Sequence, residues 1–216
     1  METLAEKLGL YDVVGVFFPG IIAIASLELF LETELYKYTA HFENSFVFIS
    51  FIIIIAYVYG LVLQECSSFI DRKFLKIREK PKQRYLLKGS KIFDSNEERN
   101  IYLRLLNDYF ETSEKKLNDK NEKERALAFY YYCASVLEMK NVDGKLNRIS
   151  SVYGLSRSLG LFYLTLGIYM CIMQQWGGIV CLIFAAIFIK RTYRFAECKV
   201  RVVIRQYYAL QKEGKE

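Results

Sequence analysis

Hydrophobic residues lie in blocks toward both ends of the chain, whereas charged residues fill the middle and the C-terminal end. A membrane-spanning helix needs about 20 predominantly apolar residues, within a range of about 17 to 25. Four blocks are candidates for such helices: residues 13–31, 46–63, 159–173 and 179–189. The first two qualify directly. The last two are shorter, and a polar turn around Trp176 separates them.

The two short blocks leave two topologies open. Continuation of the helix through Lys190 and Arg191, whose charged ends reach toward the interface, gives a fourth span, whereas the alternative is a re-entrant hairpin. We expect an all-α polytopic fold with four transmembrane helices and a helical cytosolic insert between the second and third. The predicted segments are a transmembrane hairpin (1–66), a cytosolic domain (67–157), a second transmembrane hairpin (158–192) and a basic cytosolic tail (193–216).

The distribution of basic residues predicts the orientation in the membrane. Nine Lys or Arg residues stand between Asp71 and Lys91, and eight more follow from Lys190 onward. The outer end of the first span and the loop that follows it instead have four Glu residues and one Lys. Since Lys and Arg accumulate on the cytosolic side, both termini are expected there, in the cytoplasmic (inner) membrane. The N-terminus has no basic n-region, so we expect the first apolar block to be a retained helix.

Four helices are expected in the cytosolic domain. The second span is predicted to continue to Pro81, and further helices are expected from Ser95, over 122–139 and over 145–158. Ser95 and Glu98 form a capping-box pattern, with the serine bonding forward and the glutamate back. The predicted apolar stripes are Ile101, Leu105 and Tyr109 in one helix, with Leu106 and Phe110 as further candidates, and Leu127, Tyr131, Ala134 and Leu137 in the next.

A helical domain of this size buries only a modest core. Its apolar stripes therefore need cover from the stalk helix or a neighbouring subunit, which favours a homo-oligomer, with a tetramer as the first hypothesis. Besides this second copy, the lipid bilayer is the expected partner.

Little in the composition points to catalysis. The net charge of +6 is expected for a membrane protein, so it is weak support for a nucleic-acid partner. The five cysteines form no CxxC pair, and we interpret them as reduced and structural. His41 is the only histidine, and neither phosphate-loop nor hydrolase motifs occur. We therefore expect no enzyme activity, no cofactor and no metal site.

The cytosolic domain does contain groups suited to a phosphate-bearing ligand. Cations and hydroxyl groups bind phosphate, and tyrosine rings stack on bases. The candidate ligand-binding residues are Arg125, Tyr130, Lys145, Arg148 and Ser151. The competing interpretation is structural, with tyrosines at helix-packing positions in the core and Arg157 as an anchor at the membrane interface.

The first span contains the candidate pore or hinge residues. Pro19 cannot donate to the carbonyl of Gly15, so the helix is expected to kink there, beside Gly20. Gly15, Pro19 and Ala23 give a narrow face, as Ala56 and Gly60 do in the second span; this predicts packing within the chain, a subunit interface or a gate hinge. Glu28 lies near the outer end, where it reaches water or contributes to a ring at a pore mouth.

No Asp, Glu, Lys or Arg residue lies in the middle of a predicted span, which argues against a coupled transporter.

The segment that enters the first span resembles small bacterial multi-span proteins encoded with antiphage defence genes. The shared residues are an aromatic, an acid, a glycine and a Pro-Gly pair, here Tyr11, Asp12, Gly15, Pro19 and Gly20. The order of spans and insert is similar to that of the membrane effector of Hailong-type systems, with the four-span subunit of Kiwa-type systems as a second candidate. The resemblance implies a homo-oligomeric, channel-like effector held or triggered by an oligonucleotide.

Together these observations predict an oligomeric, channel-like membrane effector. Ligand or partner binding to its cytosolic helices would shift the population between closed and open assemblies. The alternatives are a non-conducting membrane anchor or sensor that recruits a cytosolic partner and a lipid-interacting scaffold.

Overall fold

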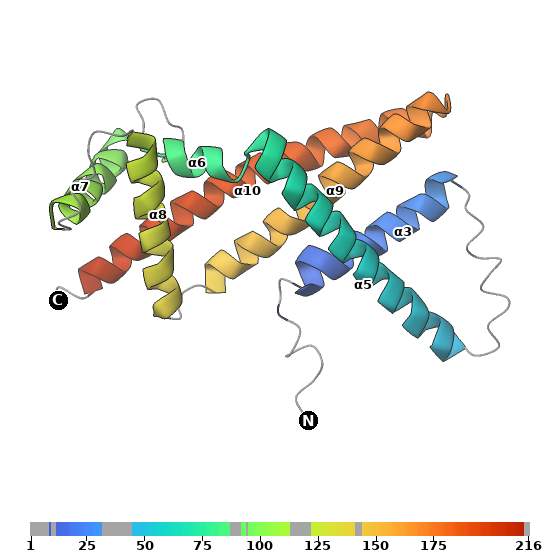
Figure 1. Cartoon of the computed structure of the whole chain (residues 1–216), viewed down its shortest axis with the longest axis horizontal. Coiled ribbons are helices and arrows are strands. Elements are labelled where there is room, and N and C mark those ends of the chain that lie inside the picture. Colours follow the sequence, from blue (N-terminus) through green and yellow to red (C-terminus); the bar gives the residue numbers. More distant parts are fainter. Residues whose placement is uncertain are drawn as a thin grey trace. The chain divides into compact units, whose positions relative to one another are not determined.

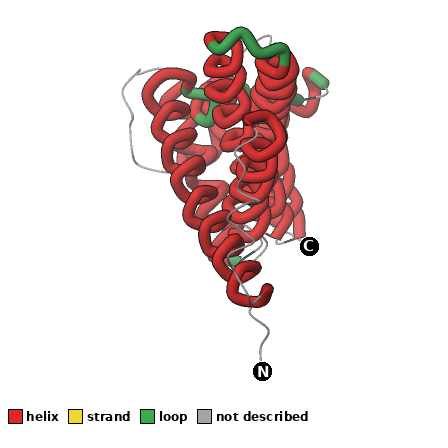
Figure 2. Tube along the Cα trace, turned by 90° about the vertical axis from the view of Figure 1, so that its right-hand side faces the viewer, coloured by secondary structure: helices red, strands yellow, loops and turns green. Residues whose placement is uncertain are grey.

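The chain folds as helices throughout the part that the structure describes. This computed structural model describes residue 9 and residues 12–31, 45–86, 92–93, 95–112, 122–140 and 144–213. Within these ranges every regular element is a helix, and no strand occurs (Figure 2). The expected all-α class is therefore confirmed.

The chain divides into two compact units, each made of two segments. Unit 1 comprises residues 1–74 and 150–192, and unit 2 comprises residues 75–149 and 193–216. Residues 158–192 thus belong with the N-terminal hairpin in unit 1. Residues 193–216, which were expected as a separate basic tail, belong to unit 2 together with most of the predicted insert.

Unit 1 contains the N-terminal apolar helices. They are η1 (Val13–Phe17) with α3 (Phe18–Leu31), and α5 (Ser45–Ile70) with η2 (Asp71–Leu75). Among the described residues, three stretches are long and apolar enough to cross a membrane: Val13–Phe30, Ile49–Leu75 and Gly144–Ile172. The isoleucines at positions 52–55 in α5 are exposed within the chain. An apolar surface of this kind is stable in lipid or against another subunit, which agrees with candidate membrane-spanning helices.

The fourth expected span is the apolar start of α10 (Gly177–Glu213), a single long helix. The apolar residues before Lys190 end at Ile189. At about 1.5 Å per residue this stretch reaches about 20 Å, less than the hydrocarbon thickness of about 30 Å. It is therefore not among the three helices that qualify by length and composition.

Pro19 follows a local departure from α-helical geometry. The five residues of η1 form a π-helical turn, in which the backbone N–H of Phe18 donates to the carbonyl of Val13. A proline ring in a regular helix would press on the carbonyl of Gly15, four residues earlier. The wider turn accommodates the ring without breaking the helix.

Small residues bring α3 and α5 into backbone contact. A Cβ atom at Gly20 would overlap the carbonyl oxygen of Ala56, and one at Gly60 would overlap the carbonyl oxygen of Val16. Ala23 is also fully buried. The small-residue motifs of the two spans therefore pack against each other within one chain, the first of the three interpretations that the sequence allows.

The other half of unit 1 is a helical hairpin. Helix α9 (Gly144–Ile172) ends in a tight turn, in which Gln174 has a φ of 57°, and α10 returns from Gly177. Figure 1 shows the two helices side by side. A Cβ atom at Gly167 would lie 2.9 Å from the Leu182 side chain, and one at Gly160 would lie 3.3 Å from that of Ile189. Trp176 at the turn is 86% exposed, which suits the expected interfacial anchor.

Unit 2 begins with a break that the sequence did not indicate. The stalk was expected to continue as one helix to Pro81. Instead η2 ends at Leu75, and Lys76 takes a positive φ of 52°. A new helix, α6 (Glu79–Arg84), then starts and includes Pro81. A proline in the first turn is tolerated because its missing N–H would have no partner within the helix.

The remaining helices of unit 2 are α7 (Asn96–Thr112) and α8 (Glu122–Met139), together with the start of α9 and the end of α10. The N–H of Glu98 donates to the Ser95 hydroxyl over 3.0 Å, so the forward half of the capping box is present. The Glu98 carboxylate, expected to bond back toward Ser95, accepts from Tyr102 and Arg205 instead.

The apolar stripes agree with the prediction only in part: Leu106 and Leu137 are buried as expected, but other positions differ. In α7 the buried residues are Tyr102 and Leu106, and Ile101 is 39% exposed. In α8 the buried residues are Ala126, Phe129, Tyr130, Cys133 and Leu137. Tyr131, expected in the stripe, is 48% exposed.

The cover for these stripes comes from the C-terminal end of the same chain. Val200, Val203, Ile204 and Tyr207 of α10 are buried in the core of unit 2. The ring of Tyr207 meets that of Phe129 of α8 edge to face, with centroids 5.9 Å apart. Helix α10 of the same chain thus provides part of the cover that the sequence analysis expected from the stalk helix or a second subunit.

Candidate functional site

The five predicted ligand-binding residues do not form one surface. Lys145 and Arg148 are exposed on the first turns of α9, in unit 2. Ser151, which was expected on their face, is 1% exposed and belongs to unit 1. In this conformation Ser151 therefore offers no hydroxyl to a ligand that binds at Lys145 and Arg148.

Arg125 and Tyr130 both lie in α8, where they contact protein. The guanidinium of Arg125 lies 4.7 Å from the centroid of the Phe110 ring, and its buried Nε atom has no hydrogen-bond partner among the described residues. Tyr130 is 2% exposed, so its ring has no free face on which a base can stack. The role expected for Tyr130 as a stacking platform does not fit this burial.

The contact made by Tyr130 leads to a group of residues that the sequence analysis missed. Lys82 of α6 is 3% exposed, and its Nζ lies 4.8 Å from the centroid of the Tyr130 ring and 4.4 Å from that of Tyr131. The same Nζ donates a hydrogen bond of 3.1 Å to the Tyr131 hydroxyl. A lysine ammonium is thus held between two tyrosines, which attract it through the negative faces of their rings.

Two further cations act on Lys82. Burial, with contributions from the positive charges of Arg78 and Lys199 and against an opposing effect of Glu79, lowers the pKa of Lys82 to about 7. Burial, with a contribution from Arg78, also lowers the pKa of Lys199 to about 8. We call Arg78, Lys82, Lys199, Tyr130 and Tyr131 the lysine–tyrosine cluster; all five belong to unit 2.

The sequence contains only part of the signal for this cluster. Arg78 and Lys82 are four residues apart, the spacing of neighbours on one helix face. Tyr130 and Tyr131 are visible as part of a tyrosine run. Nothing local connects them to Lys199, which is far away in the chain and reaches the cluster through α10.

The predicted pore and hinge residues lie in the N-terminal helices of unit 1. Gly15, Pro19 and Gly20 are buried near the contact between α3 and α5. Glu28 is half-buried in the last turns of α3. The structure brings the first three together and places Glu28 further along the same helix.

A polar network joins α5 and η2 to α9 in unit 1. The Tyr153 hydroxyl donates to Oδ2 of the buried Asp71 over 2.7 Å. The Nε atom of Arg157 donates to the Ser67 hydroxyl over 3.1 Å, and its Nη2 donates to the carbonyl of Gln64 over 3.3 Å. Arg157, expected to be an interface anchor, is therefore bound to a neighbouring helix. We call these contacts the Asp71–Arg157 network.

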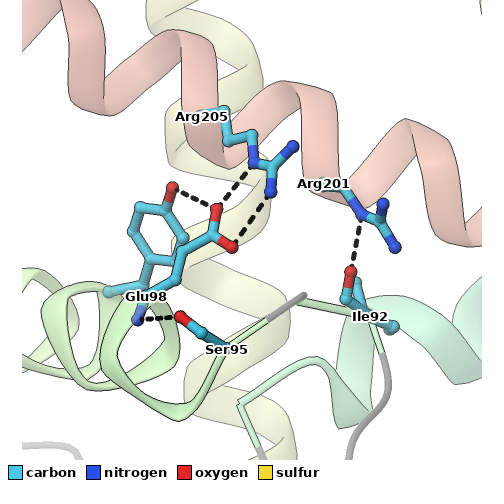
Figure 3. A network of polar contacts seen from close by, with 6 residues as sticks. Ile92, Ser95, Glu98, Arg201 and Arg205 are labelled. Atoms are coloured by element: carbon cyan, nitrogen blue, oxygen red, sulfur yellow. Dashed lines mark hydrogen bonds and ion pairs between the residues drawn. The ribbon is translucent and has the colours of Figure 1, made fainter.

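A third set of polar contacts fixes α7 to α10 within unit 2. Figure 3 shows Arg205 holding the Glu98 carboxylate through two hydrogen bonds, of 2.6 and 3.0 Å. Four residues earlier, the Nε atom of Arg201 donates to the carbonyl of Ile92 over 2.6 Å. The hydrogen bond from Tyr102, together with burial, raises the pKa of that tyrosine to about 12. These contacts stabilise the packing that creates the core of unit 2.

Among the described residues no group of three or more His, Cys, Asp or Glu side chains could hold a metal ion. His41 lies outside the described residues. Comparisons with protein families, with curated proteins and with solved structures find no match.

Proposed function

We propose that the chain is a homo-oligomeric, channel-like membrane effector that is gated from unit 2. In this proposal the chain crosses the inner membrane four times, and both termini lie in the cytosol. Binding of a ligand or partner protein to the helices of unit 2 changes the state of the spans, without catalysis. The proposed setting is bacterial antiphage defence, on the resemblance of the residues that enter the first span.

One observation carries the gating proposal: two helices are shared by both units. Helix α9 has residues 144–149 in unit 2 and the rest in unit 1. Helix α10 has residues 177–192 in unit 1 and residues 193–213 in unit 2. A continuous helix is stiff, so a ligand that moves its end in unit 2 also acts on the apolar part.

The Asp71–Arg157 network supports a two-state arrangement. Its donors, Tyr153 and Arg157, lie on the shared helix α9, and its acceptors lie on α5 and η2. Specific hydrogen bonds of this kind favour one discrete packing over a continuous range. A ligand shifts the balance only to the extent that it binds one packing more tightly than the other.

The experiment that tests this proposal measures ion flow. The protein is expressed in bacteria with a membrane-potential dye, and it is purified into potassium-loaded liposomes. Depolarisation and potassium release are expected, with a larger effect for Asp71→Asn, which weakens the network. The control is Tyr169→Phe, a change at an exposed tyrosine of α9. Absence of ion flow in both assays, with protein present in the membrane, would contradict channel activity.

Unit 2 also has a surface that suits the alternative function, a non-conducting anchor or sensor. Tyr131, Ile101 and Met139 are exposed, the last at 76%. Exposed apolar and aromatic side chains are typical of protein-binding surfaces. In that case a cytosolic protein would co-purify with the intact chain, and the ion-flow assays would be negative.

A further inference from the structure

One exposed patch of unit 1 combines aromatic rings with positive charge at the end of the second apolar helix. Phe69 of α5 is 55% exposed, and Phe74 of η2 is 67% exposed. The Nζ atom of Lys73 lies 5.5 Å from the centroid of the Phe69 ring and 5.6 Å from that of Phe74, so one ammonium contacts both rings. Arg72, the preceding residue, is also exposed. We call these four residues the Lys73 patch; all four belong to unit 1.

The local backbone explains how both rings reach one lysine. In an α-helix each residue turns by about 100°, so residues five apart lie about 140° apart around the axis. Phe69 and Phe74 are five apart and would then lie on different faces. The turn η2 is π-helical, and its wider spacing brings positions five apart closer to one face. Single π-helical turns are rare and occur frequently at functional sites.

The cations of the Lys73 patch have no acidic partner in the part of the chain that the structure describes. Asp71, the acid of the same turn, is buried, and its carboxylate accepts a hydrogen bond from Tyr153. Neither Arg72 nor Lys73 forms an ion pair with a described residue. The outer side of the turn therefore offers two positive charges and two aromatic rings to its surroundings.

The contacts within unit 1 place this patch at one end of the apolar helices. The hydroxyl oxygens of Ser67 in α5 and Ser158 in α9 lie 3.4 Å apart. A Cβ atom at Gly160 of α9 would lie 3.3 Å from the side chain of Ile189 in α10. The exposed Lys190 follows Ile189 and ends the apolar part of α10. The basic ends of two apolar helices thus lie at the same end of unit 1, as expected where helices leave a membrane.

The length of the second apolar stretch agrees with this position. Ile49–Leu75 has 27 residues, which at about 1.5 Å per residue extend over about 40 Å. The hydrocarbon core of a bilayer is about 30 Å thick, and the headgroup regions bring the total to about 40–45 Å. The basic end of the stretch therefore fits the headgroup region. There an aromatic ring reaches the acyl chains while a cation reaches the lipid phosphates.

We infer that the Lys73 patch binds anionic lipid at the cytosolic surface of the membrane. Phe69 and Phe74 contact the upper part of the acyl chains, and Arg72 and Lys73 bind the headgroup phosphate. The inference rests on the topology of the proposed function, which places this end of unit 1 toward the cytosol. It adds a class of lipid as a specific partner.

Two observations favour a lipid over another protein as the occupant. The patch continues the exposed apolar surface of α5, where the isoleucines at positions 52–55 are also exposed. A second copy of the chain packed through the same patch would bring like charges at Arg72 and Lys73 together, which disfavours that contact. The cytosolic leaflet instead carries negative charge, which attracts basic segments next to a span.

The first test compares the binding of two lipids by the full-length protein in detergent. Native mass spectrometry measures how much phosphatidylglycerol or phosphatidylcholine the protein retains over a range of lipid concentrations. The test variant is Lys73→Met, which removes the ammonium but keeps an unbranched chain beside the rings. Its matched control is Lys123→Met, which removes an equal charge from an exposed site on α8. A further variant combines Arg72→Met with Lys73→Met.

The native protein should bind phosphatidylglycerol more tightly than phosphatidylcholine. Lys73→Met should bind phosphatidylglycerol about fivefold more weakly, the factor expected for one basic side chain at the membrane surface. The double variant should lose about 25-fold on the same basis. Binding of phosphatidylcholine should stay unchanged in both, which separates loss of the site from misfolding. Lys123→Met should bind both lipids like the native protein.

A second test identifies what covers the aromatic rings. Trp176 is the only tryptophan of the chain, so Phe74→Trp combined with Trp176→Phe gives one fluorophore, located in the patch. The protein is placed in nanodiscs whose lipids carry bromine atoms at a defined depth. Bromine near the headgroup end of the acyl chains should quench the fluorescence more strongly than bromine near the chain ends.

Three results would overturn the inference: equal binding of the two lipids by the native protein, equal losses in Lys73→Met and Lys123→Met, or no quenching by brominated lipid. The last, together with a changed oligomer size in Lys73→Met, would assign the patch to a contact between subunits. Neither test involves ion flow, so the inference and the channel activity can fail separately. A conducting protein without selective lipid binding would keep the proposed function and lose this partner.

Discussion

The hydroxyl of Tyr153 in α9 donates a 2.7 Å hydrogen bond to the buried carboxylate of Asp71 at the start of η2. The two residues are far apart in the sequence, and their contact joins the end of the second apolar helix to the third. In the sequence Asp71 is only one of two acids among nine bases. In the structure it anchors the Asp71–Arg157 network.

Removing the donor with Tyr153→Phe should destabilise the protein. The carboxylate of Asp71 is 2% exposed, so water cannot easily replace the lost hydroxyl. A buried acceptor deprived of a donor costs about 1–3 kcal/mol. Thermal unfolding of the purified protein in detergent measures the change.

The matched change is Tyr169→Phe, which removes a hydroxyl from an exposed tyrosine of the same helix. This variant should leave the midpoint of thermal unfolding unchanged. Equal midpoints for the native protein and Tyr153→Phe would show that this hydrogen bond contributes little to stability.

Gly20→Ala should separate α3 from α5. The added Cβ would overlap the backbone carbonyl of Ala56, which cannot turn aside as a flexible side chain can. Overpacking of this kind costs about 1–3 kcal/mol, and the lost close contact adds to it. Thermal unfolding in detergent measures the loss.

Gly144→Ala provides the control for the same chemical change. A Cβ at Gly144 meets no atom within 4 Å, and helix α9 begins there. Alanine is the better helix former, so this variant should be as stable as the native protein or slightly more. A Gly20→Ala protein as stable as Gly144→Ala would mean that the two backbones are not in contact.

The pairing of Glu98 with Arg205 should contribute a measurable coupling energy. Arg205 binds both carboxylate oxygens, and the side chains are 20% and 41% exposed for Glu98 and Arg205 (Figure 3). For a partly exposed pair with this forked geometry we expect about 0.5–1 kcal/mol. The measurement is a double-mutant cycle with Glu98→Gln and Arg205→Gln at low salt.

The coupling should fall as salt is raised, because the pair lies near the surface. A coupling near zero at low salt would leave the hydrogen bond from Tyr102 as the main role of the Glu98 carboxylate.

A topology with four complete spans predicts on which side of the membrane the turn between α9 and α10 lies. Gln175, next to the exposed Trp176, should face the outside, and Lys212 should face the cytosol. In a variant without native cysteines, a membrane-impermeant maleimide added to intact cells should modify Gln175→Cys but not Lys212→Cys. Labelling of Gln175→Cys only after permeabilisation would instead support a re-entrant hairpin.

The pattern of apolar blocks along the sequence predicts the helices well. It does not predict which face of each helix is buried. Apolar blocks and the Ser95–Glu98 pattern place most of the elements. The stripes of α7 and α8 are displaced because adjacent residues are all large and apolar. Within each adjacent pair, Leu105 with Leu106 and Tyr130 with Tyr131, either residue satisfies the helical periodicity almost equally well. Only packing against Tyr207 and its neighbours in α10 decides which of them is buried.

The candidate site was harder to predict for a related reason. Sequence reasoning selected cations near the tyrosine run, namely Arg125, Lys145 and Arg148. It proposed Tyr130 as a ring that stacks on a base, whereas in the structure Tyr130 is buried against Lys82. Lys82 contacts Tyr130 from α6, and the local spacing of the sequence gives no sign of this contact. Helix α6 starts after the break at Lys76. No residue typical of a turn indicates this break in the sequence.

The stability of the protein should rise between pH 7 and pH 9 because of the buried lysines. The folded-state pKa of Lys82 is about 7 and that of Lys199 about 8, both below the ordinary value of 10.5. Between these values the unfolded chain holds protons that the folded chain has released. Stability then increases with pH, by at most about 1.4 kcal/mol per pH unit for each lysine. The cost of charging Lys82 is fully present below pH 7 and is relieved above it.

Thermal unfolding from pH 6 to pH 9.5 should therefore show a rise in the unfolding temperature. This rise should be smaller in Lys82→Met, which starts from a higher unfolding midpoint at pH 7. Lys123→Met should keep the native slope. Parallel curves for the native protein and Lys82→Met would mean that Lys82 keeps its ordinary pKa in the folded state, and hence that its ammonium is well solvated.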